Sequence, residues 1–534
     1  MKTTSSKGSR LLRAVSVTGV GVVCVSAMML SQKNSVQPQP QADKLSPISV
    51  PTVAARGGQP PQKPEGVMPT VPADFSISTY AEMPAPRMMV YAPNGDLFVS
   101  SPQSNNITVL RDANNDGVFE MRGVYAQGAT APVRGAGGPP PAGGGGAGRG
   151  GAPGGGGGRG GAGGGAPGGA AGGGAPAGGR GPGGGALPAA AQTPVASAPA
   201  SAGVRQPIAN PDTNPTINGP ILGANAPACT QPPAFVPGPG TLAAPFGLAF
   251  NNGYLYVGNT ASIVRYKYTN GDMIAKGEPE KIADLPAGGN HTTRNIVFNR
   301  AGTKMYVAVG SGSNNNAGED CRRAAVLEMN PDGTGMRIYA SGIRNPVGLT
   351  LQPGTDIPWV AINERDQLGD NLVPDYATSV KDGGFYGWPY SYIGSNPDPR
   401  YVGAFPDLVK RAIVPDVLIP AHSAALGIAF YTANQFPQKY RGGAFVALHG
   451  SWNRSVAAGY KVAFFPFNNG KPGPLEDFAA GFLASDGTDG PIAAWGRPVG
   501  VTVARDGALL ISDDTGNRIW KVSAAPAGGA RRGN

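Results

Sequence analysis

The sequence predicts an all-β fold, a six-bladed β-propeller with four-stranded antiparallel blades. A strand–turn–strand unit recurs six times along the chain. One unit is too small to enclose a hydrophobic core, so the copies are expected to stack around an axis. No long amphipathic helix interrupts the pattern. The units begin at Pro86, Pro245, Thr293, Asn345, Ala425 and Arg497.

The units share one plan: a turn residue or proline, a short apolar strand, a turn with glycine, and a second apolar strand. In chain order they read PRMMVYAPNGDLFVSS, PFGLAFNNGYLYVGN, TRNIVFNRAGTKMYVAVG, NPVGLTLQPGTDIPWVAIN, ALGIAFYTANQFPQKYRGGAFVAL and RPVGVTVARDGALLISDD. Further strands follow several of them. A strand at 75–80 is placed to complete the last blade and close the ring. A solenoid, the alternative, would need a more regular repeat and capping ends.

The start of the chain resembles an export signal. Residues 1–32 are expected to be a signal peptide, because basic residues precede an apolar run from Ala14 to Leu30. A membrane anchor is the alternative, but the run is marginal for a membrane span. We therefore expect a periplasmic or secreted protein with no stable membrane span after the signal is removed. In that oxidising compartment Cys229 and Cys321 could pair, although their spacing leaves the disulfide open.

Low-complexity segments surround and interrupt the propeller, which is expected to span 74–523. A Pro/Gln-rich linker covers 33–73, a Gly/Ala/Pro insertion covers 134–204, and a tail covers 524–534. The insertion buries too little apolar surface to offset its chain entropy, so we expect it to be disordered. The tail is expected to be disordered as well.

The formal net charge of +10 does not indicate a nucleic-acid partner. The first 74 residues carry a net charge of +5, the insertion adds four arginines, and the tail adds two. The remaining chain is close to neutral, so we expect no nucleic-acid binding.

Basic side chains precede most of the predicted inner strands. In a propeller the first strand of each blade lines the central channel, so the residues just ahead of these strands meet at one mouth. Clustered guanidinium groups repel one another unless an anionic group lies among them, which predicts a small polyanionic ligand. No Walker or Rossmann loop is present, which disfavours a nucleotide. The residues placed at this mouth are Arg87, Phe246, His291, Arg294, Arg344, Asn345, His422 and Arg497, with Arg454 on a nearby loop.

His291 is the candidate general base. A neutral imidazole beside a cation such as Arg294 has a lowered pKa and remains available to accept a proton. The alternative is a hydrogen-bonded structural histidine, and the same alternative applies to His422 and His449.

A loop rich in oxygen donors, residues 363–376, is the candidate metal site. Its carboxylate, amide and backbone oxygens suit Ca²⁺, although the spacing is not that of an EF-hand. A polar loop with capping acids is the alternative. The donors are Glu364, Asp366, Asp370, Asn371 and Asp375.

Five segments carry a resemblance to a known family. They are GGNHTTRNIVF, SGIRNPVGL, ERDQLGDNLVPDYATSVKDGGFYGWPYSY, LHGSWNRSVAAGYKV and WGRPVGVTV. With these segments the chain resembles the soluble glucose/sorbosone dehydrogenases, six-bladed propellers that use pyrroloquinoline quinone (PQQ) and Ca²⁺, and most of all the sorbosone-dehydrogenase-like branch. The resemblance covers about residues 80–522 apart from the insertion.

The resemblance implies a role for each matching position. His291 would take the hydroxyl proton of the substrate while hydride passes to the quinone. The positions that match cofactor-binding residues are Arg344, Asn345, Arg454 and Arg497, and the Glu364–Gln367 segment matches the calcium loop, which makes Asp366, Gln367 and Asp370 the candidate metal ligands.

The chain also departs from the family pattern in four places. Asn290 stands where the glucose enzymes have Asp, and residues near Asp366 and Gln367 replace their Gly-Pro. The cofactor lysine of the family falls near Asn453, which leaves Arg454 to supply the charge. No CxxCH motif is present for a fused cytochrome.

We therefore expect an exported quinoprotein that oxidises an aldose or a sugar-derived aldehyde and passes electrons to a separate acceptor, a quinone or a cytochrome. A Ca²⁺-dependent lactonase-type hydrolase is one alternative, although the mouth offers arginine rather than carboxylates. A non-catalytic ligand-binding propeller is the other.

Overall fold

The computed structural model describes residues 63–129 and 237–525. The predicted signal peptide, most of the linker, the predicted insertion and nearly all of the tail lie outside these residues. Cys321 is disulfide-bonded. Cys229 lies outside the described residues, so its pairing with Cys321 stays a prediction.

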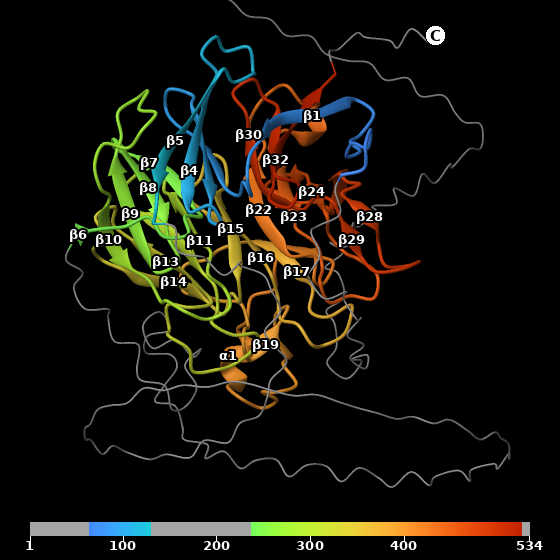
Figure 1. Ribbon diagram of the computed structural model, residues 1–534. Coiled ribbons are helices and arrows are strands. Elements are labelled where there is room, and N and C mark those ends of the chain that lie inside the picture. Colours follow the sequence, from blue (N-terminus) through green and yellow to red (C-terminus); the bar gives the residue numbers. More distant parts are fainter. Residues whose placement is uncertain (1–62, 130–236, 526–534) are drawn as a thin grey trace, which may run out of the picture.

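Six antiparallel sheets form the blades of a closed ring, and the predicted six-bladed propeller is confirmed (Figure 1). The innermost strands of successive blades contact one another in chain order, and the last contacts the first. These inner strands are β2 (Met89–Tyr91), β7 (Leu248–Asn251), β11 (Arg294–Phe298), β15 (Pro346–Leu351), β22 (Ala425–Phe430) and β30 (Pro498–Val503).

The first three blades extend outward from β2, β7 and β11. Blade 1 adds β3 (Leu97–Ser101), β4 (Asn106–Arg111) and β5 (Met121–Gln127). Blade 2 adds β8 (Tyr254–Gly258), β9 (Ser262–Lys267), β10 (Glu280–Asp284) and the short β6 (Gly238–Pro239). Blade 3 adds β12 (Met305–Val309), β13 (Ala325–Met329), β14 (Arg337–Ser341) and the short parallel strand β18 (Gly384–Phe385).

The other three blades extend from β15, β22 and β30. Blade 4 adds β16 (Pro358–Ile362), β17 (Asp375–Ser379) and β21 (Val417–Ile419). Blade 5 adds β23 (Ala444–Leu448), β24 (Lys461–Phe465) and β27 (Glu476–Ala479). Blade 6 adds β31 (Leu509–Asp513), β32 (Arg518–Ala524) and β1 (Phe75–Glu82).

Short elements decorate the blades. Helix α1 (Pro406–Lys410) and the β19 (Ser391–Tyr392)–β20 (Asn396–Pro397) hairpin lie apart from the blades at the lower end of Figure 1. A 3₁₀ turn covers Gln438–Tyr440. Two further hairpins pair β25 (Phe467–Asn468) with β26 (Lys471–Pro472) and β28 (Leu483–Ser485) with β29 (Ala493–Ala494). Among the residues described, no helix combines the length and apolar character that a membrane crossing requires.

The turn chemistry that the sequence offers explains the hairpins. Asn252 and Gly253, between β7 and β8, both have positive φ values, 45° and 75°. Such two-residue turns match the twist of an antiparallel pair, and Asn-Gly adopts them at little cost.

The ring is closed by the two ends of the propeller. β1 pairs antiparallel with β32, from Phe75 opposite Ala524 to Glu82 opposite Arg518. This confirms the predicted closing strand, and in Figure 1 the blue β1 lies beside the red β32. Phe75 anchors the strand, because its ring lies 4.7 Å from the ring of Phe436.

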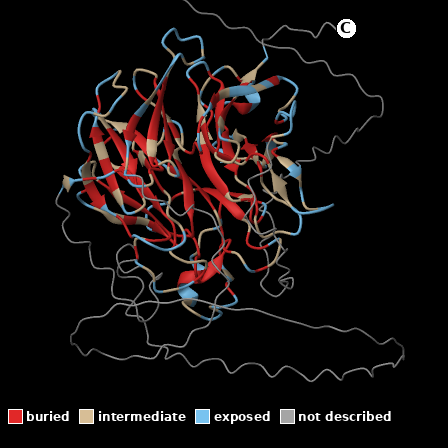
Figure 2. Ribbon diagram, in the orientation of Figure 1, coloured by how far each residue is buried: buried red, intermediate tan, exposed pale blue. Residues whose placement is uncertain are grey.

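Most of the strand residues are buried (Figure 2). At the axis a small apolar cluster joins residues that precede or begin the inner strands of five blades. Its members are Met88, Phe246, Val347, Leu426 and Val499. This cluster forms the floor of the mouth at which the residues ahead of the inner strands meet.

Phe75→Ala is expected to lower the free energy of unfolding by about 3 to 5 kcal/mol, because it opens a cavity beneath the closing strand. Ser78→Ala, on the exposed face of the same strand, is the control and should change it by less than about 0.5 kcal/mol. Urea denaturation measures both. Equal effects would show that the closing strand is not anchored through Phe75.

Candidate functional site

His291 lies in the loop that leads into β11, opposite the segment that follows β12. Because β11 pairs with β12, Arg294 lies opposite Val309, and the 286–293 loop faces residues 310–312. Gly310 permits this approach, since a Cβ at this position would overlap His291 and Asn345. The structure therefore brings His291 and Asn345 together on either side of Gly310, as the mouth hypothesis expects.

One ring nitrogen of His291 is fixed by hydrogen bonds. Nδ1 lies 2.8 Å from the carbonyl oxygen of Ser311 and 3.0 Å from Ser311 Oγ. The carbonyl can only accept, and the Ser311 hydroxyl donates to the carbonyl of Ser313. Nδ1 therefore carries the proton, and Nε2 is the acceptor nitrogen. Nε2 has no partner among the described residues and is not among the atoms sealed from solvent.

The surroundings keep this imidazole neutral. Burial, followed by the charge of Arg344, lowers the pKa of His291 to about 3. Arg294, the cation that the sequence analysis placed beside it, lowers this pKa as well but is a smaller cause.

Arg294 is placed to hold the loop rather than to touch a ligand. Its side chain is fully buried at 0% exposure. The guanidinium donates to the carbonyls of His291, Thr293 and Pro286 at 2.8 to 2.9 Å. The expected catalytic role therefore does not fit its position, whereas a positioning role does.

Arg344 is bound by two loops of the mouth. It donates to the carbonyl and side-chain oxygens of Asn314 at 2.9 Å, and to the carbonyls of Asn363 and Glu364 at 3.1 and 2.7 Å. Its guanidinium also lies 3.6 Å from the carboxylate of Asp366. Arg344 thereby ties the segment after β12 to the predicted calcium loop.

Asp366 joins His422 and Asn453 to this network. Its carboxylate accepts from Asn453 Nδ2 at 2.9 Å and lies 3.3 Å from Nδ1 of His422. The Nε2 atom of His422 donates to the carbonyl of Gly369 at 2.9 Å. Burial alone would lower the pKa of His422, but the bond to Asp366 raises it. His422 is therefore suited to serve as a cation and not as a base.

The predicted metal ligands do not converge as side chains. Gln367 is exposed, and Asp370 accepts from the Ser455 backbone N–H. Arg454 donates to the backbone carbonyl of Asp370 and so cross-links its own loop to the 363–376 loop. Of the three predicted ligands, the carboxylate of Asp366 lies close to Arg344 itself. The side-chain oxygen of Gln367 reaches this network only through Asn314, whose Nδ2 donates to it at 3.4 Å.

Arg87 and Arg497 lie in a second cluster, between blades 5, 6 and 1. Arg497 donates to the carbonyls of His449 and Gly450 at 2.9 and 2.7 Å. Arg87 lies 3.7 Å from Asp514 and 5.4 Å from the ring centre of Phe246, which belongs to the apolar floor. Since blades 3 and 6 are opposite in a ring of six, this cluster faces the His291 side across the mouth.

The clustered arginines of the mouth do not by themselves require an anionic ligand. Most donor groups of Arg294, Arg344, Arg454 and Arg497 bind backbone carbonyls, and Asp366 and Asp514 neutralise part of the charge. The arginines are therefore held together without a ligand. Buried polar atoms in or near these arginines that have no partner among the described residues include Arg87 Nε, Arg294 Nε, Asn345 Oδ1 and Asn453 Oδ1.

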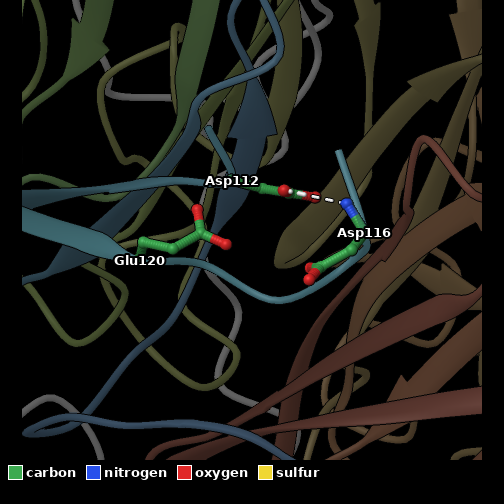
Figure 3. A group of neighbouring side chains, drawn as sticks. All are labelled: Asp112, Asp116 and Glu120. Atoms are coloured by element: carbon green, nitrogen blue, oxygen red, sulfur yellow. Dashed lines mark hydrogen bonds between the residues drawn. The ribbon is translucent and has the colours of Figure 1, made fainter. Parts of the chain in front are cut away.

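Another acidic group, which was not predicted from the sequence, lies on the loop between β4 and β5. Carboxylate oxygens of Asp112, Asp116 and Glu120 lie within 4.8 Å of one another (Figure 3). Within residues 63–129 and 237–525, these three side chains are the one group of His, Cys, Asp or Glu residues that lie close enough together to hold a metal ion. The spacing D-x-N-x-D-G over 112–117, a pattern of calcium loops, is the signal that would have found it.

A cavity of about 560 Å³ opens at the other end of the channel. It is lined by the central and final residues of the inner strands and by the turn after β11, including Asn299 and Arg300. It lies away from His291, which precedes β11.

Two family models match the chain. The model described as Glucose / Sorbosone dehydrogenase matches residues 256–451, and the model described as TrAA12-like matches residues 409–525. The first spans the loops of His291, Arg344 and Asp366, and the second spans those of His422, Arg454 and Arg497.

Individual proteins are similar over different lengths. An uncharacterized protein of Borreliella burgdorferi is 30% identical over 298 residues, which is 53% of this chain and 76% of that protein. A pyrroloquinoline quinone-dependent pyranose dehydrogenase of Coprinopsis cinerea is 31% identical over 126 residues, 21% of this chain and only 16% of that protein. The solved holo form of the PQQ domain of pyranose dehydrogenase from that organism has a TM-score of 0.54 at 17% identity and covers 89% of this chain and 100% of its own. This structural similarity shows the fold.

His291 is expected to stay neutral, with its proton on Nδ1, from pH 8 to pH 5. Its pKa of about 3 lies below the unfolded value of about 6.5. Between these values only the unfolded chain binds the proton, so stability falls as the pH falls. Nitrogen NMR of ¹⁵N-histidine-labelled protein tests this, with the three histidines assigned by single substitutions. A His291 midpoint near 6.5, or a proton on Nε2, would contradict the geometry.

Proposed function

Because the chain belongs to the glucose/sorbosone dehydrogenase family, we propose that it is a quinoprotein that oxidises an aldose or a sugar-derived aldehyde. The observation that carries this proposal is the acceptor nitrogen of His291. The Ser311 carbonyl fixes the proton on Nδ1 and leaves Nε2 open to the mouth. An oriented neutral imidazole is suited to general-base catalysis.

The residues of the mouth fit a polar cofactor with a hard cation. When bound, PQQ supplies the hydride acceptor, and Ca²⁺ polarises it. The unpartnered Arg87 Nε is a donor for an anionic group, and Asn345 Oδ1 and Asn453 Oδ1 are hard acceptors near the Asp366 network. Similarity to a named PQQ-dependent protein supports the same cofactor.

Each predicted binding residue has a place in this proposal. Arg87 and Asn345 have unpartnered atoms that are buried in this structure, and they would reach the cofactor through a side-chain rearrangement that exposes those atoms. Arg344, Arg454 and Arg497 would set the electrostatic surroundings of the cofactor from their carbonyl-bound positions. His422 holds Asp366 in place, and Asp366 with backbone oxygens of Gln367 and Asp370 would hold the Ca²⁺.

His291 would accept the hydroxyl proton of the substrate at Nε2. The Nδ1–H bond to Ser311 stabilises the imidazolium that forms, because the carbonyl can accept from it in either charge state. An anionic cofactor beside the ring would raise the low pKa toward the working range. Arg294 holds the carbonyl of His291 and so keeps the ring in place.

The wider setting belongs to the same proposal. We also propose that the chain has the segment boundaries and the export signal given under Sequence analysis, and that the protein is periplasmic or secreted. Its proposed substrate is sorbosone-like, and its proposed electron acceptor is a separate molecule. Resemblance to the sorbosone-dehydrogenase-like branch supports the substrate class.

His291→Ala is expected to lower kcat for dye-linked sugar oxidation by about 10³-fold, because it removes the base. Quinone affinity, followed by absorbance titration of the calcium-loaded protein, should change less than about threefold. Thr292→Ala, the next residue of the loop, is the matched control and should retain turnover. No dye-linked sugar oxidation by the wild-type protein at saturating quinone would contradict the proposed function.

Removal of calcium is expected to release the quinone. Substitutions show which of the two acidic loops, the 363–376 loop or the β4–β5 loop, binds the calcium ion on which quinone affinity depends. Asp366→Asn should lower calcium-dependent quinone affinity by at least about tenfold, the usual effect of disturbing a metal site. Asp116→Asn, on the loop of Figure 3, should leave it unchanged. Fluorescence titration with quinone at fixed calcium concentrations measures both, and the reverse pattern would place the functional ion on the β4–β5 loop.

A further inference from the structure

A second oriented imidazole lies on the far side of the mouth from His291. The Nε2 atom of His449 lies 2.9 Å from Oδ1 of Asp514. Since a carboxylate can only accept, Nε2 carries the proton and Nδ1 is the acceptor nitrogen. Nδ1 has no hydrogen-bond partner among the described residues, and it is not one of the atoms sealed from solvent. The side chain keeps 16% of its surface exposed.

His449 is held in place by residues of three blades. Its backbone N–H donates to the carbonyl of Ala424, just ahead of β22, at 3.0 Å, and its carbonyl accepts from Arg497. Asp514 follows β31 and also lies 3.7 Å from Arg87, just ahead of β2. The imidazole is therefore positioned at the mouth, next to the strands that line the channel.

Burial and two nearby guanidinium groups keep His449 neutral, although the carboxylate of Asp514 acts in the opposite direction. Burial, followed by the charge of Arg497, lowers the pKa of His449 to about 4, and Arg87 acts in the same direction. Burial raises the pKa of Asp514, but His449 and Arg87 together hold it well below its usual range. Asp513, which accepts from the Arg497 backbone N–H, is the other acid at this point.

Of the three histidines, two have this arrangement. His291 and His449 each have one nitrogen fixed by an oxygen acceptor and the other unpartnered. His422 has both nitrogens bound, to Asp366 and Gly369. The mouth therefore holds two imidazoles with an unpartnered nitrogen, on opposite sides, and one histidine whose two nitrogens are both bound.

The proposed reaction needs two proton acceptors. Oxidation of a hemiacetal carbon to a carbonyl removes two electrons and two protons. One proton leaves the hydroxyl oxygen for His291. The other leaves the carbon within the hydride, and it is released as a proton only when the two electrons pass to the external acceptor.

We propose that His449, oriented by Asp514, accepts this second proton and serves the half of the reaction in which electrons leave for the acceptor. The inference rests on the proposed function. Nδ1 of His449 takes the proton as the two electrons reach the acceptor. Two cytochromes would take one electron each, whereas a quinone or an artificial dye would take both electrons and draw its protons from solvent. The imidazolium is stabilised by Asp514 and returns its proton to solvent through the exposed part of the ring.

The test separates the two half-reactions by rapid mixing of the calcium- and quinone-loaded protein. His449→Gln should slow re-oxidation by dye about 100-fold and leave reduction by sugar within about twofold. His291→Gln should give the opposite pattern. Asp514→Asn, a second variant, should also slow re-oxidation, because it weakens the orientation of the ring. Unchanged re-oxidation in His449→Gln, or an equal loss in both half-reactions, would overturn the inference.

Two measurements that do not depend on turnover complete the test. Nitrogen NMR of the protein without quinone should show His449 protonated on Nε2 and neutral at pH 7. Quinone affinity of His449→Gln, measured by fluorescence titration, should stay within about threefold of wild type. A large loss of affinity would overturn the inference in favour of a binding role. Failure of the wild-type protein to bind quinone would instead overturn the proposed function, and the inference with it.

Discussion

The pairing of β1 with β32 is the constraint on which the rest of the structure depends. It joins residues 75–82 to residues 518–524 and so converts six sheets into a closed ring. Only a closed ring fixes the six inner strands around one axis, since an open array could splay at its ends. The mouth residues come from loops as far apart as Arg87 and Arg497. Their convergence therefore depends on contacts at the periphery, such as those of Phe75 with Phe436 and Phe478.

The arginines of the mouth act as a framework. Backbone carbonyls have no side chain to reposition, so a guanidinium bound to two or three of them fixes the path of a loop. Arg294 fixes the His291 loop, Arg344 joins two loops of blades 3 and 4, and Arg497 fixes the loop after β23. This framework leaves His291 and His449, each with one unpartnered ring nitrogen, as the candidate reactive groups. Because most polar atoms of the mouth have partners, its loops are held in place. The two neutral imidazoles are therefore kept in position, where they can act as bases.

The fold could be predicted from the sequence because each blade repeats the same local signals. The apolar alternation and glycine turns of all six units were sufficient to place the inner strands, and the strand at 75–80 was identified from its position. The residues of the mouth could be predicted from that topology, but their hydrogen-bond partners could not. No local pattern shows that Arg294 donates to Pro286 and His291 or that Asp514 orients His449, because these contacts arise from packing between blades. The acidic loop of Asp112 was missed although its spacing was readable.

The central claim is that the mouth ahead of the inner strands holds one ligand between two oriented imidazoles. A crystal structure of the protein loaded with PQQ and Ca²⁺ tests it most directly. The account predicts cofactor density above Phe246 and Val347, with Nε2 of His291 on one side and Nδ1 of His449 on the other. Density in the cavity at the opposite end of the channel, beside Asn299 and Arg300, would contradict it.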